Sequence, residues 1–561
     1  MADPKPRTSF PLLRPLPLLL LLWTAIALVY APSYRSGLVA EFLGLFHSID
    51  QLSFFDFINR SQAEVKSFYQ LTQLQLWIWI RLFGSSFVPW FLLFTFLHAV
   101  VGTLSFFFFR NLFADFSVKK GEQIALTGML FFLLSPNITE VTIWRGGYHY
   151  LTGMILQLSI LSFIRSYLLT LKIRYVWLAG LFFFLSIFTL EIFYITPILS
   201  LALIGGYRFN EKAIPEAGRK AVVLVLLPQL MLFGFHLLIF RLMYGSWIAH
   251  YGVTADFKLD PGEMVVRMVK YLCDITLFTA QYPTDLRLKI YGSMASPALC
   301  RTIIVVLLLI VVFLLSRFRA LSARGQVAAF LLTALLSALI LISPIYYDDI
   351  FTLYNSRRSY QISVFFCMLL STILFGISRG KVLRGIIAIY FFVCVGFLLR
   401  KICHWSTAAR VQYTLLEGLN PDEDRPTILL NVPAYFQDVR VLPADKDQAF
   451  PGQRTLFTGK PHPSSLYTVS SYNMLHDWDG AHVTVVDSQT LKVTLNQWGT
   501  WWMWNYAGAG SYENDLFVFE LTDPGHEYHI RFKENPQQLN IFFQQGYQWK
   551  KVDLSRSAEQ W

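Results

Sequence analysis

Residues 87–109 read FVPWFLLFTFLHAVVGTLSFFFF, a stretch with no Asp, Glu, Lys or Arg and a single histidine, His98. A helix of this length is about 35 Å long, since each residue adds about 1.5 Å. That exceeds the roughly 30 Å of hydrocarbon in a bilayer. The stretch therefore predicts a transmembrane helix, and the rest of the chain can be compared with it.

The same kind of stretch recurs along the chain. The 561 residues are 55% hydrophobic and 15% charged, with a mean hydropathy of +0.46, which is too apolar for an ordinary soluble protein. The sequence predicts an α-helical polytopic membrane protein with about eleven spans. These spans are expected at 15–32, 87–109, 123–141, 150–171, 175–190, 192–207, 221–243, 302–316, 327–344, 361–378 and 384–400.

The first span follows three basic residues, Lys5, Arg7 and Arg14, as the hydrophobic part of a signal peptide would. No small-residue cleavage site comes after it, so we expect a retained helix. The other basic residues between spans alternate along the chain in a way that places them on the side of the N-terminus. They are Arg110, Lys119, Lys120, Lys172, Arg174, Arg208, Lys212, Arg219, Lys220, Arg317, Arg319, Arg324, Arg379, Lys381 and Arg384.

The positive-inside rule then predicts a cytoplasmic N-terminus, and an odd number of spans puts residues 403–561 outside. These loops account for most of the net charge of +11, so the charge does not indicate nucleic-acid binding. An outside tail and only five cysteines suit a bacterial inner membrane with a periplasmic tail. Cys273 and Cys300 share an outer segment and could form a disulfide there.

Three segments are expected outside the membrane. The transmembrane domain, 1–402, includes outer loops at 33–86 and 245–301, and 403–561 forms a separate domain. Within the first loop, 71–82 is amphipathic and aromatic, which predicts a helix lying in the interface. The tail alternates polar and apolar residues at 481–486, 491–495 and 516–521, between turn residues. This pattern predicts a β-rich extracytoplasmic domain.

Charged residues stand at the ends of apolar segments in three places, where charge is costly in a membrane and is usually kept for a partner or a ligand. These places are Pro136-Asn137-Ile138-Thr139-Glu140-Val141-Thr142-Ile143-Trp144, Leu190-Glu191 followed by Pro197, and Ser356-Arg357-Arg358-Ser359-Tyr360-Gln361-Ile362-Ser363. Tyr69-Gln70-Leu71 in the first loop and Leu97-His98-Ala99 in a span precede them.

In this order, the segments resemble motifs of the GT-C class of polytopic membrane glycosyltransferases, in the branch similar to protein O-mannosyltransferases. The resemblance covers about residues 1–400. It implies an enzyme that transfers a hexosyl or pentosyl group, with inversion, from a polyprenyl-phosphate donor to an acceptor outside the membrane. The acceptor would be a glycan, a lipid or a protein. The sequence departs from these motifs at Gln70 and Leu190, where the family has Arg and Lys, and it lacks a paired acid in the first loop.

The implied reaction needs a general base to remove the proton of the acceptor hydroxyl. Asp50 is the first candidate and Asp56 the second, since the resemblance places the base in the first loop. A solvated loop acid or a helix cap is the alternative for each residue.

The departing lipid phosphate needs cations, and a guanidinium group can hold a phosphate through two hydrogen bonds. Arg357 and Arg358, just before the tenth span, are the expected phosphate-binding residues, and Arg145 and His149 are further cationic candidates on the same side. The alternative for the two arginines is an interaction with lipid headgroups.

Tyr69, Glu140 and Glu191 are expected to support the site. The two glutamates could bind a divalent cation, but pairing with Arg145, Arg357 or Arg358 is the commoner outcome within a helix bundle. His98 is expected to make a hydrogen bond between helices rather than to bind a ligand.

Two features of the tail have simple interpretations. Asp477-Trp478-Asp479 resembles the Asp-x-Asp of nucleotide-sugar enzymes, but the tail is expected outside the cytoplasm, so a turn between strands is predicted. The aromatic cluster Trp498, Trp501, Trp502, Trp504 and Tyr506 could stack on sugar rings or sit at the interface, but a core role is favoured.

Two alternatives to the enzyme remain open. The departures at Gln70 and Leu190 favour a non-catalytic GT-C-like scaffold subunit of a membrane or envelope complex, which would bind a protein partner through 403–561. A transporter is less favoured, because the sequence shows no inverted repeat.

Overall fold

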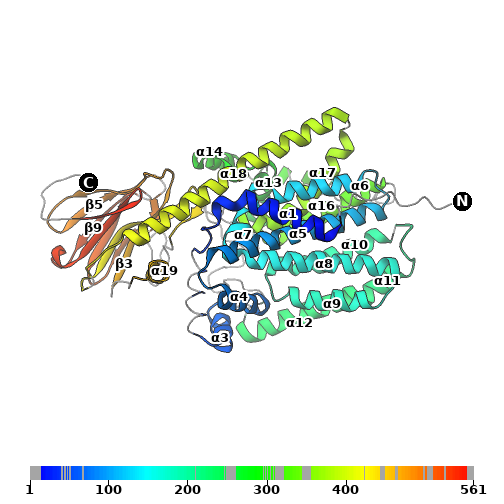
Figure 1. Cartoon of the computed structure of the whole chain (residues 1–561), viewed down its shortest axis with the longest axis horizontal. Coiled ribbons are helices and arrows are strands. Elements are labelled where there is room, and N and C mark those ends of the chain that lie inside the picture. Colours follow the sequence, from blue (N-terminus) through cyan, green and yellow to red (C-terminus); the bar gives the residue numbers. More distant parts are fainter. Residues whose placement is uncertain are drawn as a thin grey trace.

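The computed structural model is a helical bundle joined by one long helix to a β-rich region (Figure 1). The structure describes residues 14–39, 52–65, 68–208, 210–245, 261–294, 321–343, 356–378, 380–422, 424–442, 449–460, 465–496, 499–501, 510–523 and 526–552, with a few isolated positions between them.

The bundle and its outer segments contain most of the helices. Their bounds are α1 Pro15–Tyr30, α3 Phe54–Val65, α4 Gln70–Phe83, α5 Phe87–Asp115, α6 Gly121–Leu133, α7 Thr139–Ile143, α8 Tyr148–Thr170, α9 Arg174–Ser186, α10 Thr196–Tyr207, α11 Ala217–Ala221, α12 Leu227–Tyr244, α13 Pro261–Leu277, α14 Thr284–Met294, α16 Ala323–Ile342, α17 Ser359–Ile377 and α18 Gly380–Gly418.

Seven helical segments among the described residues are long and apolar enough to cross a membrane, or eight when α6 and the bent segment after it count as one span. They contain α1, α5, α8, α11 with α12, α16, α17 and α18. Two shorter apolar segments, Arg174–Ser186 and Glu191–Tyr207, match expected spans in position. The expected span at 302–316 lies almost wholly outside the described residues, so eleven spans stay a prediction.

The expected span at 123–141 is broken near its end. The chain bends by 56° between α6 and Pro136–Ile143. Pro136 starts the short helix η3, Pro136–Ile138, and it cannot donate the backbone hydrogen bond that would continue α6. The bend turns α7 across the end of the bundle.

The basic loops gather at the end of the bundle far from the β-rich region (Figure 1). At this end Arg165 of α8 donates two hydrogen bonds to Asp115 of α5, and Tyr207 of α10 donates another to the same carboxylate. Lys212 reaches the carbonyl oxygen of Ala114 at 2.5 Å. Lys212, Lys119 and Arg324 thus lie at this end, while Arg317, Arg319 and Arg379 lie outside the described residues.

Helix α18 leads from the bundle to the β-rich region and continues through the expected domain boundary at 402/403 up to Gly418. Its last turns carry apolar residues on one face, among them Trp405, Ala408 and Leu415, and these are buried. Trp549 of the β-rich region donates a hydrogen bond to the carbonyl oxygen of Leu415 at 2.8 Å. The β-rich region is thus packed against the helix that supports it.

The tail forms two sheets, as the alternating pattern predicted. The first has the order β11-β10-β1-β3-β6, with β2 paired to β1, and β1 lies parallel to both of its neighbours β10 and β3. The second is antiparallel, in the order β4-β5-β9-β8-β7. Strand bounds are β1 Thr427–Phe436, β2 Val439–Arg440, β3 Leu466–Met474, β4 His482–Val485, β5 Thr490–Thr494, β6 Gly499–Trp501, β7 Ser511–Glu513, β8 Phe517–Asp523, β9 Glu527–Phe532, β10 Asn540–Gln545 and β11 Gln548–Lys551, with helix α19 at Ala449–Thr458.

The sheets are tied together through their shared core, where Tyr528 of β9 donates a hydrogen bond to the carbonyl oxygen of Leu430 in β1. Asp477 and Trp478 form a turn between β3 and β4, as expected. The Asp479 carboxylate accepts hydrogen bonds from the backbone of Leu475 and His476, which fixes that turn. Among the five predicted aromatic residues, Trp498, Trp502, Trp504 and Tyr506 lie outside the described residues.

Candidate functional site

The bend at Pro136 places Glu140 against the segment before α17. Arg357, in the short helix η10 (Ser356–Arg358), donates from Nη1 to Glu140 Oε1 at 2.8 Å and from its backbone N–H to Oε2 at 3.0 Å. The exposed fractions of the two residues are 8% and 4%. Glu140 thus pairs with Arg357, one of the three partners expected from the sequence.

Trp144 lies between this ion pair and the β-rich region. Its indole N–H donates to the carbonyl oxygen of Val39, which attaches it to the start of the first loop. The Arg357 guanidinium carbon lies 4.6 Å from the ring centroid of Trp144, and that of Arg440, in β2, lies 5.2 Å from it. One indole therefore contacts a cation from the bundle and a cation from the tail.

Arg145 is buried next to this group, but its contacts differ from the expected role. Its guanidinium donates to the carbonyl oxygens of Thr142 and Ser36 at 3.3 and 3.4 Å and lies over the ring of Phe94. Its backbone N–H donates to the carbonyl oxygen of Gly37. Gly37 has a φ of +97°, and a Cβ there would lie 2.0 Å from the carbonyl oxygen of Ile143. These contacts hold the first loop against α7.

Arg358 is also buried, with 5% of its surface exposed. It contacts Tyr271 of α13, in the second outer loop. Burial raises the pKa of the Tyr271 phenol, and the charge of Arg358 opposes that rise. Arg358 thus lies against the second outer loop.

Tyr69, Glu191 and His149 form a second group at the same end of the bundle. The Tyr69 hydroxyl lies 2.8 and 2.7 Å from the two carboxylate oxygens of Glu191. The ring of His149 lies 5.1 Å from that of Tyr69 and stacks on Tyr148 at 3.9 Å. The structure therefore brings together Tyr69, Glu191 and His149, while Glu140, the other residue expected to support the site, pairs with Arg357.

The two candidate bases have different outcomes. Asp50, the first choice, lies outside the described residues. Asp56 is exposed in the first turn of α3, and its carboxylate accepts a hydrogen bond from the Ser53 hydroxyl at 2.5 Å. The Asp56 backbone N–H points back to the same hydroxyl at 3.3 Å, which is a capping arrangement. These contacts match the alternative interpretation of Asp56, in which its carboxylate helps to cap a helix.

His98 shows the expected contact between helices. Its Nδ1 lies 2.8 Å from the Tyr360 hydroxyl, joining α5 to α17. Among the described residues no cluster of three His, Cys, Asp or Glu side chains could hold a metal ion. Cys273 lies in α13, and Cys300 lies outside the described residues, so their pairing stays a prediction.

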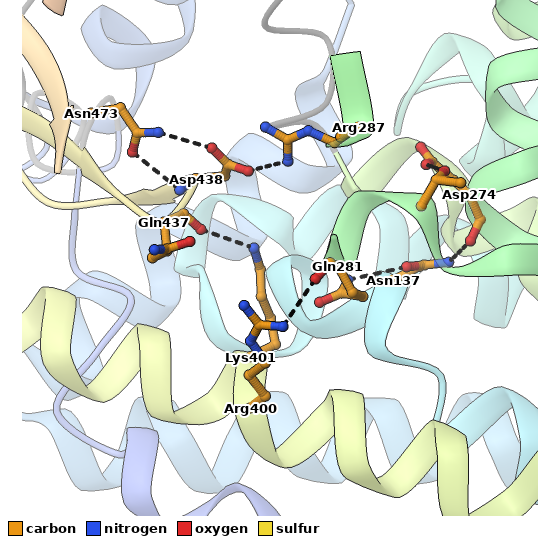
Figure 2. Close-up of polar contacts among 10 residues, drawn as sticks. Asn137, Asp274, Gln281, Arg287, Arg400, Lys401, Gln437, Asp438 and Asn473 are labelled. Carbon is orange, nitrogen blue, oxygen red and sulfur yellow. Dashed lines mark hydrogen bonds and ion pairs between the residues drawn. The ribbon is translucent and has the colours of Figure 1, made fainter. Parts of the chain in front are cut away.

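Figure 2 shows a polar network between the bundle and the tail that was not predicted. Asp438, in the turn between β1 and β2, accepts from Arg287 of α14 and from Asn473 of β3. Lys401 of α18 donates to the carbonyl oxygen of Gln437 at 3.4 Å. Burial alone would raise the pKa of Asp438, but the charges of Arg287 and Lys401 hold it below its usual value.

A signal for this network was present in the sequence. Arg400 and Lys401 stand at the outer end of the last expected span, against the positive-inside pattern of the other loops. Arg400 donates to the carbonyl oxygen of Gln281, whose side chain reaches Asn137 at 3.3 Å. Basic residues on the wrong side of a membrane span indicate a specific partner, and here the partners lie in the second outer loop and in the tail.

No protein-family model matches this sequence, and no curated protein matches it at a significant level. The site must therefore be interpreted from its own chemistry. Among its described residues, Arg357 and Arg440 lie over Trp144, with Glu140 as one counter-charge, while Arg145 is buried against Phe94 and Arg358 is buried against Tyr271. A buried group of guanidinium side chains suits the binding of an anion with several oxygens, such as a phosphate.

Proposed function

We propose that this protein is an integral membrane glycosyltransferase of the GT-C type, which transfers a sugar from a polyprenyl-phosphate donor to a glycan, lipid or protein acceptor. The observation that carries the proposal is the group of buried arginines at the end of the bundle that bears the outer segments. A buried cation group at a helix-bundle end is costly unless a ligand or a partner uses it.

In the proposed reaction an acceptor hydroxyl attacks the anomeric carbon of the donor. The bond from that carbon to the phosphate oxygen breaks, and its electron pair leaves with the polyprenyl phosphate. Arg358, assisted by Arg357, stabilises the negative charge that develops on this oxygen. A carboxylate takes the hydroxyl proton, and Asp50 is the proposed base, with Asp56 second.

The remaining residues position these groups. Glu140 orients Arg357 through two hydrogen bonds. Glu191 and Tyr69 form a hydrogen-bonded pair beside His149, where a sugar or acceptor hydroxyl could bind. The proposed membrane is a bacterial inner membrane, with the basic loops in the cytoplasm and the β-rich region in the periplasm, because the basic loops share one end of the bundle.

The test uses purified protein in proteoliposomes with polyprenyl-phosphate sugars that carry a radiolabel in the sugar. We expect one hexose or pentose donor to be consumed with release of polyprenyl phosphate. Arg358→Gln should lower this rate by about 100-fold, as removal of a transition-state hydrogen-bond donor does. Arg425→Gln is the matched control, since Arg425 is exposed in the tail. Unchanged turnover by Arg358→Gln, or no turnover of any donor, would overturn the proposal.

A second candidate is a non-catalytic scaffold subunit, and the pairing of Arg357 with Glu140 favours it, because an ion pair can serve packing alone. The carbonyl contacts of Arg145 have the same character. Purification from the native membrane separates the candidates. A scaffold would copurify with partner subunits at fixed stoichiometry and would bind no polyprenyl phosphate.

A further inference from the structure

The turn between β3 and β4 carries an aromatic side chain that the fold leaves exposed. Trp478 is 70% exposed, and its indole stacks on the imidazole of His476, with ring centroids 4.5 Å apart and 2° between the ring planes. Among the described residues of the tail, Val486 is the only other large apolar side chain that is exposed. Since His476 covers one face of the indole, the exposure of Trp478 leaves the other face open to a ligand.

The turn holds this ring pair in a fixed place. The Asp479 carboxylate accepts hydrogen bonds from the backbone N–H groups of Leu475 and His476 and from the side-chain amide of Asn496, at 2.8, 3.2 and 3.1 Å. Gly480 then packs directly on β10, because a Cβ there would lie 2.4 Å from the backbone of that strand. A rigid surface loses little conformational entropy when a ligand binds, so the turn is preorganised for binding.

Polar groups border the exposed ring. The Tyr547 hydroxyl, in the turn between β10 and β11, donates to the Asp477 carboxylate at 3.0 Å and accepts from Arg410 of α18 at 2.7 Å. The neighbouring Gly546 brings this turn against the indole, because a Cβ there would lie 3.7 Å from the Cα of Trp478. The side chains of Arg410 and Asp477 are 63% and 39% exposed. A hydrogen-bond donor and an acceptor therefore lie beside the ring, and both are open to a ligand.

The size and chemistry of this patch favour a sugar over a protein or a membrane. A stable protein interface takes about 800 Å² from each partner, whereas one indole supplies at most roughly 250 Å². Insertion into a membrane would carry Asp477 and Arg410 into an apolar medium at a high cost. A sugar ring has C–H groups on its faces and hydroxyls at its edge. The faces can pack on an indole, and the hydroxyls can bond to a carboxylate and a guanidinium.

The patch lies at the edge of the sheet that faces the bundle. Because β1 is parallel to both β3 and β10, the carboxyl ends of the three strands lie at one edge. At this edge the β1–β2 turn contacts Lys401 and Arg287 (Figure 2). The backbone N–H of Gln437 in that turn donates to the carbonyl oxygen of Met474 at 2.8 Å, which ties it to the end of β3. A ligand on the β3–β4 turn would therefore lie on the side of the tail that faces the bundle.

We propose that the β3–β4 turn is a glycan-binding site, in which the open face of Trp478 stacks on a sugar ring and Asp477 and Arg410 bond to its hydroxyls. The ligand class is a neutral glycan, because the two charged groups at the ring have opposite signs. The inference concerns binding and does not depend on the proposed transfer of a sugar. If that transfer takes place, the bound glycan is its acceptor.

The experiment measures binding of the full-length protein to an array of neutral oligosaccharides of glucose, galactose, mannose and N-acetylglucosamine. The protein is held in phosphatidylcholine nanodiscs, which carry no sugar headgroup. We expect wild type to bind at least one oligosaccharide. Trp478→Ala should weaken that binding about tenfold, as expected for the loss of one stacked aromatic contact. Trp478→Phe keeps a smaller flat ring and should retain part of the affinity.

Two further variants test the patch. Trp177→Ala is the matched control, since Trp177 is 74% exposed but lies in α9, and it should bind like wild type. Asp477→Ala removes the charged acceptor beside the ring and should weaken binding about tenfold. Melting temperatures of all variants show whether each one is folded.

Binding of no oligosaccharide by wild type, or equal binding by Trp478→Ala, would overturn the inference. Brominated phosphatidylcholine tests the membrane alternative. If it quenches the fluorescence that Trp478→Phe lacks, the ring lies in the bilayer and the glycan assignment is wrong. Consumption of a polyprenyl-phosphate sugar without glycan binding would remove this inference and leave the proposed function. Glycan binding that needs Trp478, without turnover of any donor, would do the reverse.

Discussion

At the scale of single residues, the contact between Glu140 and Arg357 joins positions 217 residues apart in the chain. Both side chains are almost fully buried, and Arg357 also lies over Trp144. A buried ion pair is weak evidence of net stability, because both charges lose their hydration. Loss of one partner, in contrast, is expected to destabilise the protein, because it leaves the other charge buried without compensation.

We therefore predict that Glu140→Gln lowers the stability of the protein by about 3–5 kcal/mol. The double variant Glu140→Met, Arg357→Met should recover most of this loss, because it removes both charges and keeps apolar volume. Thermal unfolding of the detergent-solubilised protein measures the effect. Arg425→Gln, at an exposed site, serves as the control and should melt like wild type. If Glu140→Gln also melts like wild type, the ion pair does not hold α7 against η10.

At the scale of elements, α8 packs closely on η5, Glu191–Ile195, through one glycine. A Cβ at Gly153 would lie 1.9 Å from the Phe193 ring. No other residue type leaves room for this contact. The contact joins the two elements that carry site residues. His149 lies four residues before Gly153 in α8, and Glu191 lies two residues before Phe193 in η5.

We predict that Gly153→Ala destabilises the protein by about 1–3 kcal/mol through overpacking. Gly180→Ala is the matched control, because Gly180 also lies inside a helix but has open space around it. That variant should be neutral or slightly more stable, since Ala favours helix. Melting temperatures compare the two, and Phe193→Leu should restore part of the loss in Gly153→Ala. Equal melting temperatures for the two alanine variants would contradict the close packing.

Sequence reasoning found the elements that have a strong local signal. Hydropathy located α5, α8, α16 and α17, and alternation located β4, β5 and β8. Hydropathy alone extended the third expected span, 123–141, through Pro136. A hydropathy average does not register that proline has no backbone N–H to continue the helix. Hydropathy also ended the last span near residue 400, although Trp405, Ala408, Gln412 and Leu415 continue a helical period. Attention to that period would have extended α18.

The site was predictable only in part, for a physical reason. Charge at the ends of apolar segments singled out Glu140, Glu191 and Arg357, because a membrane makes unpaired charge costly. Which partner each residue takes depends on long-range packing, as in the contact of Tyr69 with Glu191. The approach of Arg440 to Trp144 depends on the conformation of a hairpin turn in the tail. Neither pairing has a signature within the local sequence.

At the scale of the whole molecule, the two ends of the bundle differ in chemistry. One end carries the basic loops around Asp115 and Arg324, and the other carries the outer segments, the C-terminal part of α18 and the β-rich region (Figure 1). The Ser36 hydroxyl and the Leu38 carbonyl oxygen contact Trp405 and Gln412 of α18, so the first loop also belongs to the second end.

We predict that the basic end faces the cytoplasm and the β-rich region faces outward. The test replaces the five native cysteines with serine and adds either Lys119→Cys or His482→Cys, since both positions are exposed. In bacterial spheroplasts a membrane-impermeant maleimide should label the His482→Cys protein directly. The Lys119→Cys protein should be labelled only after the membrane is permeabilised, because the positive-inside rule keeps that loop inside. Direct labelling of Lys119→Cys with protection of His482→Cys would reverse the orientation. It would also place the arginine group around Trp144 on the cytoplasmic side, where a donor site facing outward could not operate.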